Sequence, residues 1–213
     1  MMRGPSPADT LALRRVRARS YLAYAGEEQH QLYYIQEGWA ARFRLLTDGR
    51  RQITALFLPG EYCEPLWLLG ERPEQSIIAL TQVLAHPVVQ WSTLAGALQK
   101  LEPSSPILQA MIESFNRQSN WIVSLGRKTA IERLSDLFCD VFERMERAGL
   151  VYGDQCAMPL TQADLADIAG LTTVHVNRIL HELKSRGLVE LRSKWLRILD
   201  LESLRLLAMA KAA

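Results

Sequence analysis

The stretch from Leu160 to Leu183, LTQADLADIAGLTTVHVNRILHEL, constrains the fold of this chain more than any other. Thr161 can accept a hydrogen bond from an orphan backbone N–H, and Asp164, three residues later, completes a shortened capping box. A first helix is therefore expected to begin here and to end at Gly170, where a residue with positive φ can stop it. Thr172 is the expected N-cap of a second helix. Two short capped helices around a tight turn predict a helix-turn-helix.

The second helix of this stretch has one apolar and one polar face. The apolar residues follow the i, i+3, i+4, i+7 spacing of a single stripe: Val176, Ile179, Leu180 and Leu183. The opposite face begins with residues of the kind that a recognition helix offers to base edges in the major groove: Thr173, Val174, Asn177 and Arg178. The alternative is an ordinary αα-hairpin in a helical core. Caps, turn, core and outward polar set agree better with DNA binding.

Composition sets only broad limits on the rest of the chain. With 213 residues there is room for two small domains, and the net charge of +2 permits DNA binding without arguing for it. The sequence contains no run of about 18 apolar residues, so no membrane span is expected. The N-terminal residues lack the apolar core of a signal peptide. Three widely spaced cysteines, Cys63, Cys139 and Cys156, form no metal or redox pair, which favours a reducing cytoplasm.

The first hundred residues predict an antiparallel β-barrel or jelly roll. From about Arg14 to Trp91 short strand-like segments alternate with turns, among them the hairpin signal Thr47–Arg50 and the turn Pro59–Tyr62. Strands at this spacing without helical periodicity are typical of such folds. A short helix is expected over residues 92–100. We therefore interpret residues 1–100 as a β domain of the effector-binding type.

A long helix is expected to follow, since Pro106 suits a first helical turn. Its residues three and four apart form a coiled-coil seam: Leu108, Met111, Phe115, Gln118, Ile122 and Leu125. The pattern predicts dimerisation, and the alternative is a helix packed on its own domain. Gly126 interrupts the seam, so we place a hinge over residues 126–129. Residues 101–127 are interpreted as the dimerisation helix.

The remaining residues, 128–213, predict a winged helix-turn-helix domain. An amphipathic helix spans Ala130 to Arg147, and a C-terminal stop after the second helix falls at Arg186-Gly187. A hairpin around Arg192–Lys194 then has the form of a wing with a basic tip, which suits contact with phosphates. A closing helix is expected over Leu201–Ala210. The whole chain is thus predicted to be α+β, with an N-terminal β domain and C-terminal helices.

From about Arg14 to Leu207 the chain resembles the cyclic-AMP receptor/FNR (Crp/Fnr) family of bacterial transcription regulators. The resemblance rests on the helix-turn-helix stretch, the long helix and three turn motifs of the β domain: Glu37-Gly38, Asp48-Gly49-Arg50 and Pro59-Gly60-Glu61. It implies a cyclic-nucleotide-binding-like domain, a dimerisation helix and a winged helix. It also implies double-stranded promoter DNA and a second copy as partners, RNA polymerase if the protein is an activator, and no enzymatic activity.

The resemblance also assigns the DNA contacts. Thr173, Val174 and Arg178 match base-reading positions, and Arg178 is the candidate for a bidentate contact to guanine. Val174 stands where many members carry glutamate, so a thymine methyl is its expected contact and the site read departs from the commonest one. Asn177 can read adenine or touch phosphate. Three residues fall where the family contacts the DNA backbone: Gln162, Thr172 and His175. For His175 a solvent-facing position is the alternative.

The effector is not identified by the sequence. The family's cyclic-nucleotide cassette has Gly-Glu-Leu followed by Arg-Ser, but here Glu64-Pro65-Leu66 and Gln75-Ser76 stand in its place. The arginine for the cyclic phosphate is missing and Glu64 adds a negative charge, which argues against cyclic AMP. The cysteine cluster of an iron–sulfur centre is absent as well. The candidate effector pocket comprises Glu64, Trp67, Gln75, Ser76, Gln118 and Ser119.

Other readings of the sequence stay open. Cys63 is either a redox sensor or a buried structural thiol, and haem is possible through His30 or His86 without an attachment motif. A cupin-like enzyme would need clustered His and Glu ligands, whereas these histidines are isolated and suggest neither a metal nor a catalytic site. A winged helix used for protein–protein contact without DNA is a further alternative. We interpret the chain as a homodimeric, sequence-specific transcription regulator.

Overall fold

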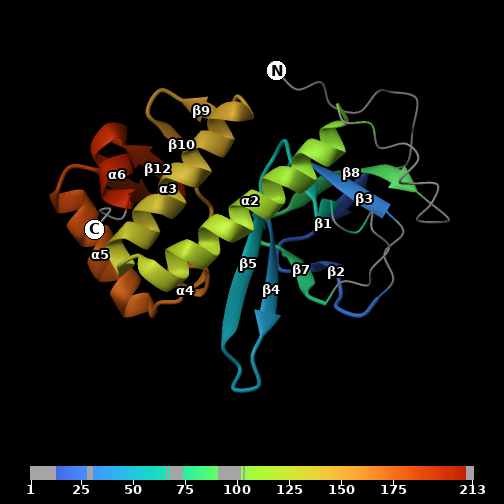
Figure 1. Cartoon of the computed structure of the whole chain (residues 1–213), viewed down its shortest axis with the longest axis horizontal. Helices are drawn as coiled ribbons and strands as arrows, with labels where there is room; N and C mark the ends of the chain where they lie inside the picture. The colour runs from blue at the N-terminus through green and yellow to red at the C-terminus, as the bar shows by residue number, and fades with distance from the viewer. Residues whose placement is uncertain are drawn as a thin grey trace. The chain divides into compact units, whose positions relative to one another are not determined.

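The computed structural model describes residues 13–27, 31–65, 67, 74–90, 102 and 104–209. The chain forms two compact units, Met1–Gln118 and Ser119–Ala213, so the border falls inside the long helix α2 (Pro106–Arg127) (Figure 1). Helix α2 begins at Pro106, as predicted. The short helix expected over residues 92–100 lies outside the described residues.

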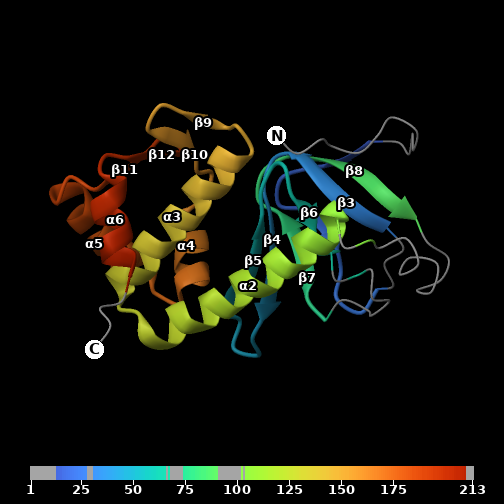
Figure 2. The ribbon, with the colours of Figure 1, turned by 45° about the horizontal axis from the view of Figure 1, so that its top comes forward.

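The N-terminal unit contains two four-stranded antiparallel sheets (Figure 2). One has the order β1 (Arg14–Val16), β8 (Val83–Gln90), β3 (Gln31–Glu37) and β6 (Tyr62–Cys63). The other has the order β2 (Tyr21–Ala23), β7 (Ser76–Ala79), β4 (Ala40–Leu45) and β5 (Arg51–Phe57). Within the described residues the two sheets do not close into a barrel, which confirms the jelly roll among the two predicted forms.

Local turn chemistry sets the connections of these strands. The β4–β5 hairpin turns at Thr47–Arg50, where Asp48 Oδ1 accepts from the backbone N–H of Arg50 at 3.0 Å. Gly38 joins β3 to β4 with φ +83, and a Cβ there would lie 2.0 Å from the carbonyl oxygen of Gln82. Glycine is therefore required at this position, which explains the Glu37-Gly38 motif.

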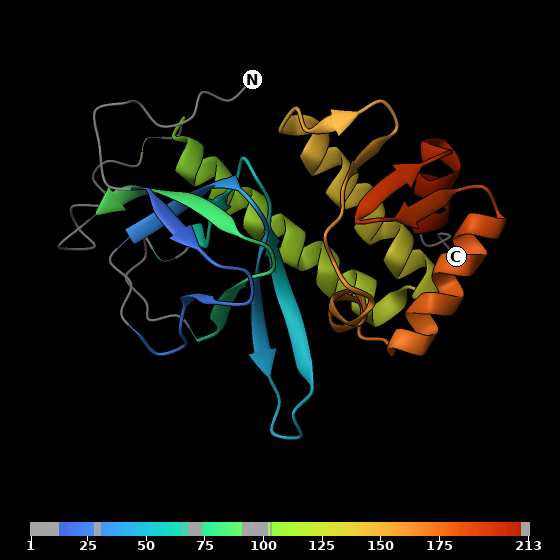
Figure 3. The same ribbon diagram turned by 180° about the vertical axis from the view of Figure 1, so that it is seen from behind.

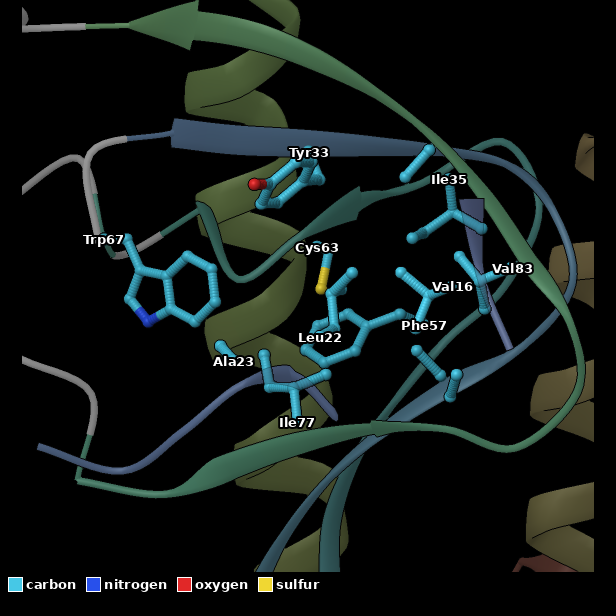
Figure 4. Packing of buried hydrophobic residues seen from close by; sticks show 13 residues of the cluster. Val16, Leu22, Ala23, Tyr33, Ile35, Phe57, Cys63, Trp67, Ile77 and Val83 are labelled. Atoms are coloured by element: carbon cyan, nitrogen blue, oxygen red, sulfur yellow. The ribbon is translucent and has the colours of Figure 1, made fainter. Parts of the chain in front are cut away.

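The core of the N-terminal unit lies between its sheets (Figure 4). Cys63 and Trp67 point into it beside Leu22, Phe57 and Ile77, and Cys63 has no exposed surface. On the outer side, Leu32 packs against Ile107 and Met111 at the start of α2. The N-terminal part of the predicted seam helix is thus partly packed on its own domain.

The C-terminal unit is a winged helix (Figure 3). Its helices are α3 (Ala130–Arg147), α4 (Gln162–Ala169), α5 (Thr173–Ser185) and α6 (Leu201–Ala208). Its antiparallel sheet has the order β11 (Val189–Arg192), β12 (Trp195–Ile198), β10 (Gln155–Ala157) and β9 (Val151–Tyr152). Helix α3 has the predicted bounds and contacts α4, α5 and α6. Its buried face includes Leu134, Leu137, Phe138 and Val141.

The break between α2 and α3 lies within the predicted hinge, residues 126–129, but Gly126 is not part of it. Helix α2 continues through Gly126 and ends at Arg127. The chain leaves the helix at Lys128, and Thr129 caps α3 by donating its backbone N–H to Glu132 Oε2 at 2.7 Å. A glycine in an exposed helical position costs only about 1 kcal/mol. The capping interaction therefore fixes the break, and Gly126 does not.

Candidate nucleic-acid interface

A closed set of hydrogen bonds fixes the start of α4. Thr161 Oγ1 accepts from the backbone N–H of Asp164 at 3.1 Å, while the backbone N–H of Thr161 donates to Asp164 Oδ2 at 3.0 Å. The Thr161 hydroxyl also donates to this carboxylate at 2.7 Å. The Asp164 side chain is buried, so its charge is compensated by these donors and by the positive end of the helix dipole. The predicted capping box is confirmed.

The turn after α4 depends on the backbone conformation of Gly170 and on hydrogen bonds from Arg133. Gly170 has φ 64 and ψ 42, the left-handed conformation expected for the glycine of this turn. Arg133 of α3 donates through Nη1 to the carbonyl of Ala169 at 3.1 Å and through Nε to the carbonyl of Lys128 at 2.9 Å. Arg133 thus fixes the turn to the beginning of α3. No local sequence signal identifies it, since its partner lies 36 residues away.

Helix α5 is buried on one side and open on the other. Thr172 caps it by accepting from the backbone N–H of His175 at 3.3 Å. Val176, Ile179 and Leu183 are buried, and Leu180 is half-buried. The predicted DNA contacts are all exposed except His175, which is half-buried: Gln162, Thr172, Thr173, Val174, Asn177 and Arg178. Val174 is 79% exposed, so its methyl groups are accessible to a ligand.

One interaction on this open face was not anticipated from the sequence. The Nη2 of Arg178 lies 2.5 Å from the Nε2 of His175. Because the guanidinium can only donate, the contact is favourable when Nε2 is the unprotonated nitrogen of a neutral imidazole. The i, i+3 spacing of a helix makes this contact possible. It holds the Arg178 guanidinium along α5.

The β11–β12 hairpin forms the predicted wing. Its turn residues Ser193 and Lys194 have φ 53 and φ 66, as a two-residue type I′ hairpin turn requires. The side chains of Arg192 and Lys194 are exposed. At the base of the wing, Arg197 Nε pairs with Asp154 Oδ2 at 2.8 Å, which joins β12 to the β9–β10 turn. The wing therefore carries exposed positive charge at its tip and a paired charge at its base.

The exposed apolar residues of α2 are only partly those of the predicted seam. Phe115 and Ile122 are 69% and 72% exposed, but Leu108, Met111 and Leu125 are half-buried. Ile112 and Val123 are exposed instead, at 55% and 56%. We define the apolar stripe of α2 as Ile112, Phe115, Ile122 and Val123. Gln118 is half-buried, and its Nε2 makes no hydrogen bond within the described part of the chain.

The residues of the candidate effector pocket are engaged in different interactions. Glu64 forms an ion pair with Arg42, and Gln75 Oε1 accepts from the Thr54 hydroxyl at 2.5 Å. Trp67 belongs to the core. Ser76 Oγ accepts from the backbone N–H of Ala25 at 3.0 Å, and Ser119 is exposed on α2. The sequence did not point to Arg42 or Thr54, whose roles depend on pairing between strands.

The cysteines and histidines of this structure do not form a reactive centre in the described residues. Burial, and secondarily the Glu64 carboxylate, raise the pKa of Cys63 well above its usual range. Burial also raises the pKa of Cys139 to about 12 and that of Cys156 to about 11. Neutral buried thiols are poor nucleophiles, so the structural reading of Cys63 is favoured over the redox one. His86 Nε2 lies 2.6 Å from Gln36 Oε1, and His30 is outside the described residues.

Two features are absent from the part of the chain that the structure describes. In that part, no three His, Cys, Asp or Glu side chains gather where they could hold a metal ion. None of the helices described there combines the length and the apolar character of a membrane span.

Comparison with known protein families agrees with both units. Residues 13–88 match the cyclic nucleotide-binding domain, and residues 132–207 match the Crp-like helix-turn-helix domain. The chain belongs to the Crp/Fnr family. This Crp/Fnr protein is 28% identical over 181 residues to the nitrogen fixation regulation protein FixK of Rhizobium meliloti, covering 84% of this chain and 79% of FixK. It is 26% identical to the transcriptional activator protein FnrL of Cereibacter sphaeroides, covering 83% and 73% of the two chains.

A solved structure supports the same fold. FixK2 from Bradyrhizobium japonicum superimposes with a TM-score of 0.77 over 94% of this chain and 98% of that chain, at 24% identity. At this identity the likeness establishes the fold. The two domains of a Crp/Fnr regulator are therefore present in this chain, in the expected order.

Proposed function

We propose that this Crp/Fnr-family protein acts as a homodimer that binds promoter DNA sequence-specifically and regulates transcription. The observation that carries the proposal is the two-sided form of α5, which is held by Val176 and Leu183 and exposes Arg178. A helix packed on one side and polar on the other can enter the major groove with its first turns against base edges. Membership of a family of DNA-binding transcription regulators supports the same function.

The exposed residues of the helix-turn-helix and the wing divide into base readers and contacts to the DNA backbone. We assign base reading to Thr173, Val174, Asn177 and Arg178. Arg178 suits a bidentate contact to guanine, and the exposed Val174 suits a thymine methyl. We assign phosphate contacts to Gln162, Thr172, His175, Arg192 and Lys194. Donors at the capped start of α5 and cations on the wing suit this role, because phosphate contacts fix the register of a protein on the duplex.

The homodimer rests on the apolar stripe of α2. Its four side chains, Ile112, Phe115, Ile122 and Val123, are each more than half exposed on a helix of 22 residues. Contiguous exposed apolar surface on a long helix marks a protein–protein interface. A second copy covers this stripe most simply in a symmetric coiled coil, in which the same residues meet from both sides. Such a dimer carries two reading helices.

The remaining partners follow from this role. RNA polymerase is the expected protein partner if the dimer activates transcription, as the relative FnrL does by its name. A cytoplasmic location is consistent with three free, buried cysteines. We assign no enzymatic activity to the chain.

Replacement of Arg178 tests the reading role. The duplex is one isolated by selection with the wild-type protein, and binding is measured by titration against it and against an unrelated duplex. Arg178→Ala should weaken binding to the selected duplex by about 1–3 kcal/mol, or roughly 5- to 150-fold. Binding to the unrelated duplex should change far less. Arg186→Ala is the matched control, because Arg186 is also exposed on the end of α5 and is paired with Glu182.

The same titration separates this function from a winged helix that binds only proteins. Phosphate contacts release counterions, so the logarithm of DNA affinity should fall linearly with the logarithm of salt concentration. A protein that binds no duplex at low salt, or whose Arg178→Ala variant keeps full discrimination, would contradict the proposal.

A further inference from the structure

The interior of the N-terminal unit contains an ion pair between its two sheets. Arg42 lies on β4 of one sheet, and Glu64 follows β6 of the other. Arg42 Nη1 and Glu64 Oε2 are 2.5 Å apart, and their side chains are 13% and 4% exposed. Burial of a charge is costly unless it is paired and hydrogen-bonded. A buried pair adds nothing to the solubility of the surface, so its presence in the interior needs another physical explanation.

Hydrogen bonds extend the pair to two more residues. We call the resulting cluster of Arg42, Thr54, Glu64 and Gln75 the polar seat. Arg42 Nε donates to Thr54 Oγ1 at 3.2 Å, and Thr54 in turn bonds Gln75 Oε1 at 2.5 Å. Thr54 therefore holds the guanidinium in place, and pairing of a guanidinium with a carboxylate or phosphate is the way in which arginine binds anions. The seat thus has the chemistry of an anion site, and the anion in it is the side chain of Glu64.

The chain around Glu64 holds the carboxylate in the seat. Cys63 before it and Trp67 after it both belong to the core (Figure 4), and the backbone N–H of Trp67 donates to the carbonyl of Glu64 at 3.1 Å. Glu64 has φ +53, a left-handed conformation that residues other than glycine adopt rarely. Packing on both sides therefore maintains an unfavourable backbone conformation that directs the carboxylate to Arg42.

These residues do not fit a cyclic nucleotide. They lie in the region that matches the cyclic nucleotide-binding domain, whose ligand has an anionic phosphate. A phosphate bound at Arg42 would lie beside the buried Glu64 carboxylate, and two like charges in a site of low polarity repel strongly. Arg42 is already neutralised, so a second anion gains little from it.

We propose that Glu64 is a built-in anion that occupies this seat in place of an external anionic ligand. The N-terminal unit then holds its folded conformation without an anionic effector. This inference concerns the N-terminal unit and does not depend on the DNA-binding proposal. It also predicts that removal of the Glu64 side chain opens a site for a small carboxylate.

The test is chemical rescue of Glu64→Ala in the full-length protein. Acetate supplies the methyl carbon and carboxylate that this substitution removes, and acetamide is its neutral counterpart. Thermal unfolding is followed at constant ionic strength, with sodium chloride as the balancing salt. Glu64→Ala should lower the Tm by roughly 10 °C, and acetate should raise it again in proportion to the logarithm of its concentration. Acetamide should not, and the wild-type Tm should respond to neither acetate nor cyclic AMP.

A nearby exposed pair gives the matched control. Arg44, also on β4, pairs with Glu74 at 3.1 Å, with side chains 55% and 82% exposed. Glu74→Ala should leave the Tm within about 1 °C of wild type and create no response to acetate. The comparison isolates burial of the carboxylate, because both substitutions remove one glutamate paired with an arginine of the same strand.

Glu64→Gln keeps the inference testable if the alanine variant fails to fold. It preserves the side-chain shape and leaves the Arg42 charge uncompensated, so its Tm should lie below that of wild type. Arg42→Met combined with Glu64→Leu removes both charges and should fold without any acetate response. A wild-type Tm raised by cyclic AMP, a Glu64→Gln variant as stable as wild type, or a folded Glu64→Ala variant that ignores acetate would overturn the inference.

Discussion

Helix α5 of the C-terminal unit and the Arg42–Glu64 pair of the N-terminal unit use polar side chains in opposite ways. On α5 of the C-terminal unit, Thr173, Asn177 and Arg178 are exposed above a buried apolar face. In the N-terminal unit, Arg42 and Glu64 face inward and neutralise each other. An exposed polar group exchanges water for a ligand at little cost, whereas a buried one must be satisfied by its own chain. Outward polar residues are thus suited to recognition, and inward ones to specifying the fold.

This difference predicts two separate kinds of mutational effect. Replacement of an exposed residue of α5 should change DNA binding and leave stability nearly unchanged. Replacement of a buried polar residue of the N-terminal unit should change stability and leave base preference unchanged. A buried substitution in the N-terminal unit that altered base preference would show that the two units are coupled.

The largest effect on binding is expected from the apolar stripe of α2. Phe115→Glu places a charge at a position that is 69% exposed in a single copy and central to the proposed dimer. Each monomer should stay folded, but loss of the second reading helix should weaken binding to a two-half-site duplex by on the order of 100-fold. Sedimentation and duplex titration measure the two quantities.

Asn120→Glu is the control for this substitution. Asn120 is exposed on α2 about 140° around the helix from Phe115, so the same charge is added outside the stripe, beyond its Val123 edge. It should remain a dimer with wild-type affinity. A Phe115→Glu variant that sediments as a dimer would remove the stripe from the interface.

A smaller effect is expected from the cap of α4. Thr161→Ala removes the acceptor for the backbone N–H of Asp164 and leaves the buried carboxylate with fewer donors. The free energy of unfolding should fall by about 1 kcal/mol, while base preference is retained, because Thr161 has no reading role. Thr161→Ser keeps the hydroxyl and should restore most of the loss in denaturant titrations.

The smallest effect is expected at the wing. Lys194→Ala removes one exposed cation from the β11–β12 turn. The slope of the logarithm of affinity against the logarithm of salt concentration should decrease by about 1, equally for selected and unrelated duplexes. If the loss were confined to the selected duplex, Lys194 would be a base reader and not a phosphate contact.

The C-terminal unit could be predicted closely because its signals are local. Thr161, Asp164 and Gly170 act within a few residues of one another, so the caps and the turn of the helix-turn-helix can be read from their spacing. The same holds for the wing, whose two-residue turn lies between alternating strands. The jelly roll was also expected, from short strands separated by turn residues.

The polar seat could not be predicted, since its partners come together only in the folded chain. Arg42 and Glu64 are 22 residues apart and lie on different sheets. A resemblance placed Glu64 near an effector site, and only strand pairing identifies Arg42 and Thr54 as its neighbours. Arg133 was missed for the same reason, because its acceptor Ala169 is on another helix.

The seam of α2 shows a further limit of sequence patterns. Apolar residues three and four apart indicate a buried face, but they do not say whether the helix's own domain or a second copy buries it. Met111 packs against Leu32 of its own domain, whereas Phe115 and Ile122 stay exposed. Which apolar residues of α2 stay exposed for a partner therefore depends on which of them its own domain buries.

The proposed function requires that two copies of α5 read two half-sites. Selection from randomised duplexes with the wild-type protein, followed by footprinting, tests it most directly. We expect an inverted repeat whose half-sites lie about one helical turn apart, roughly 34 Å, each with a guanine whose recognition is lost in Arg178→Ala. Enrichment of a single unpaired site, or of no sequence, would contradict it.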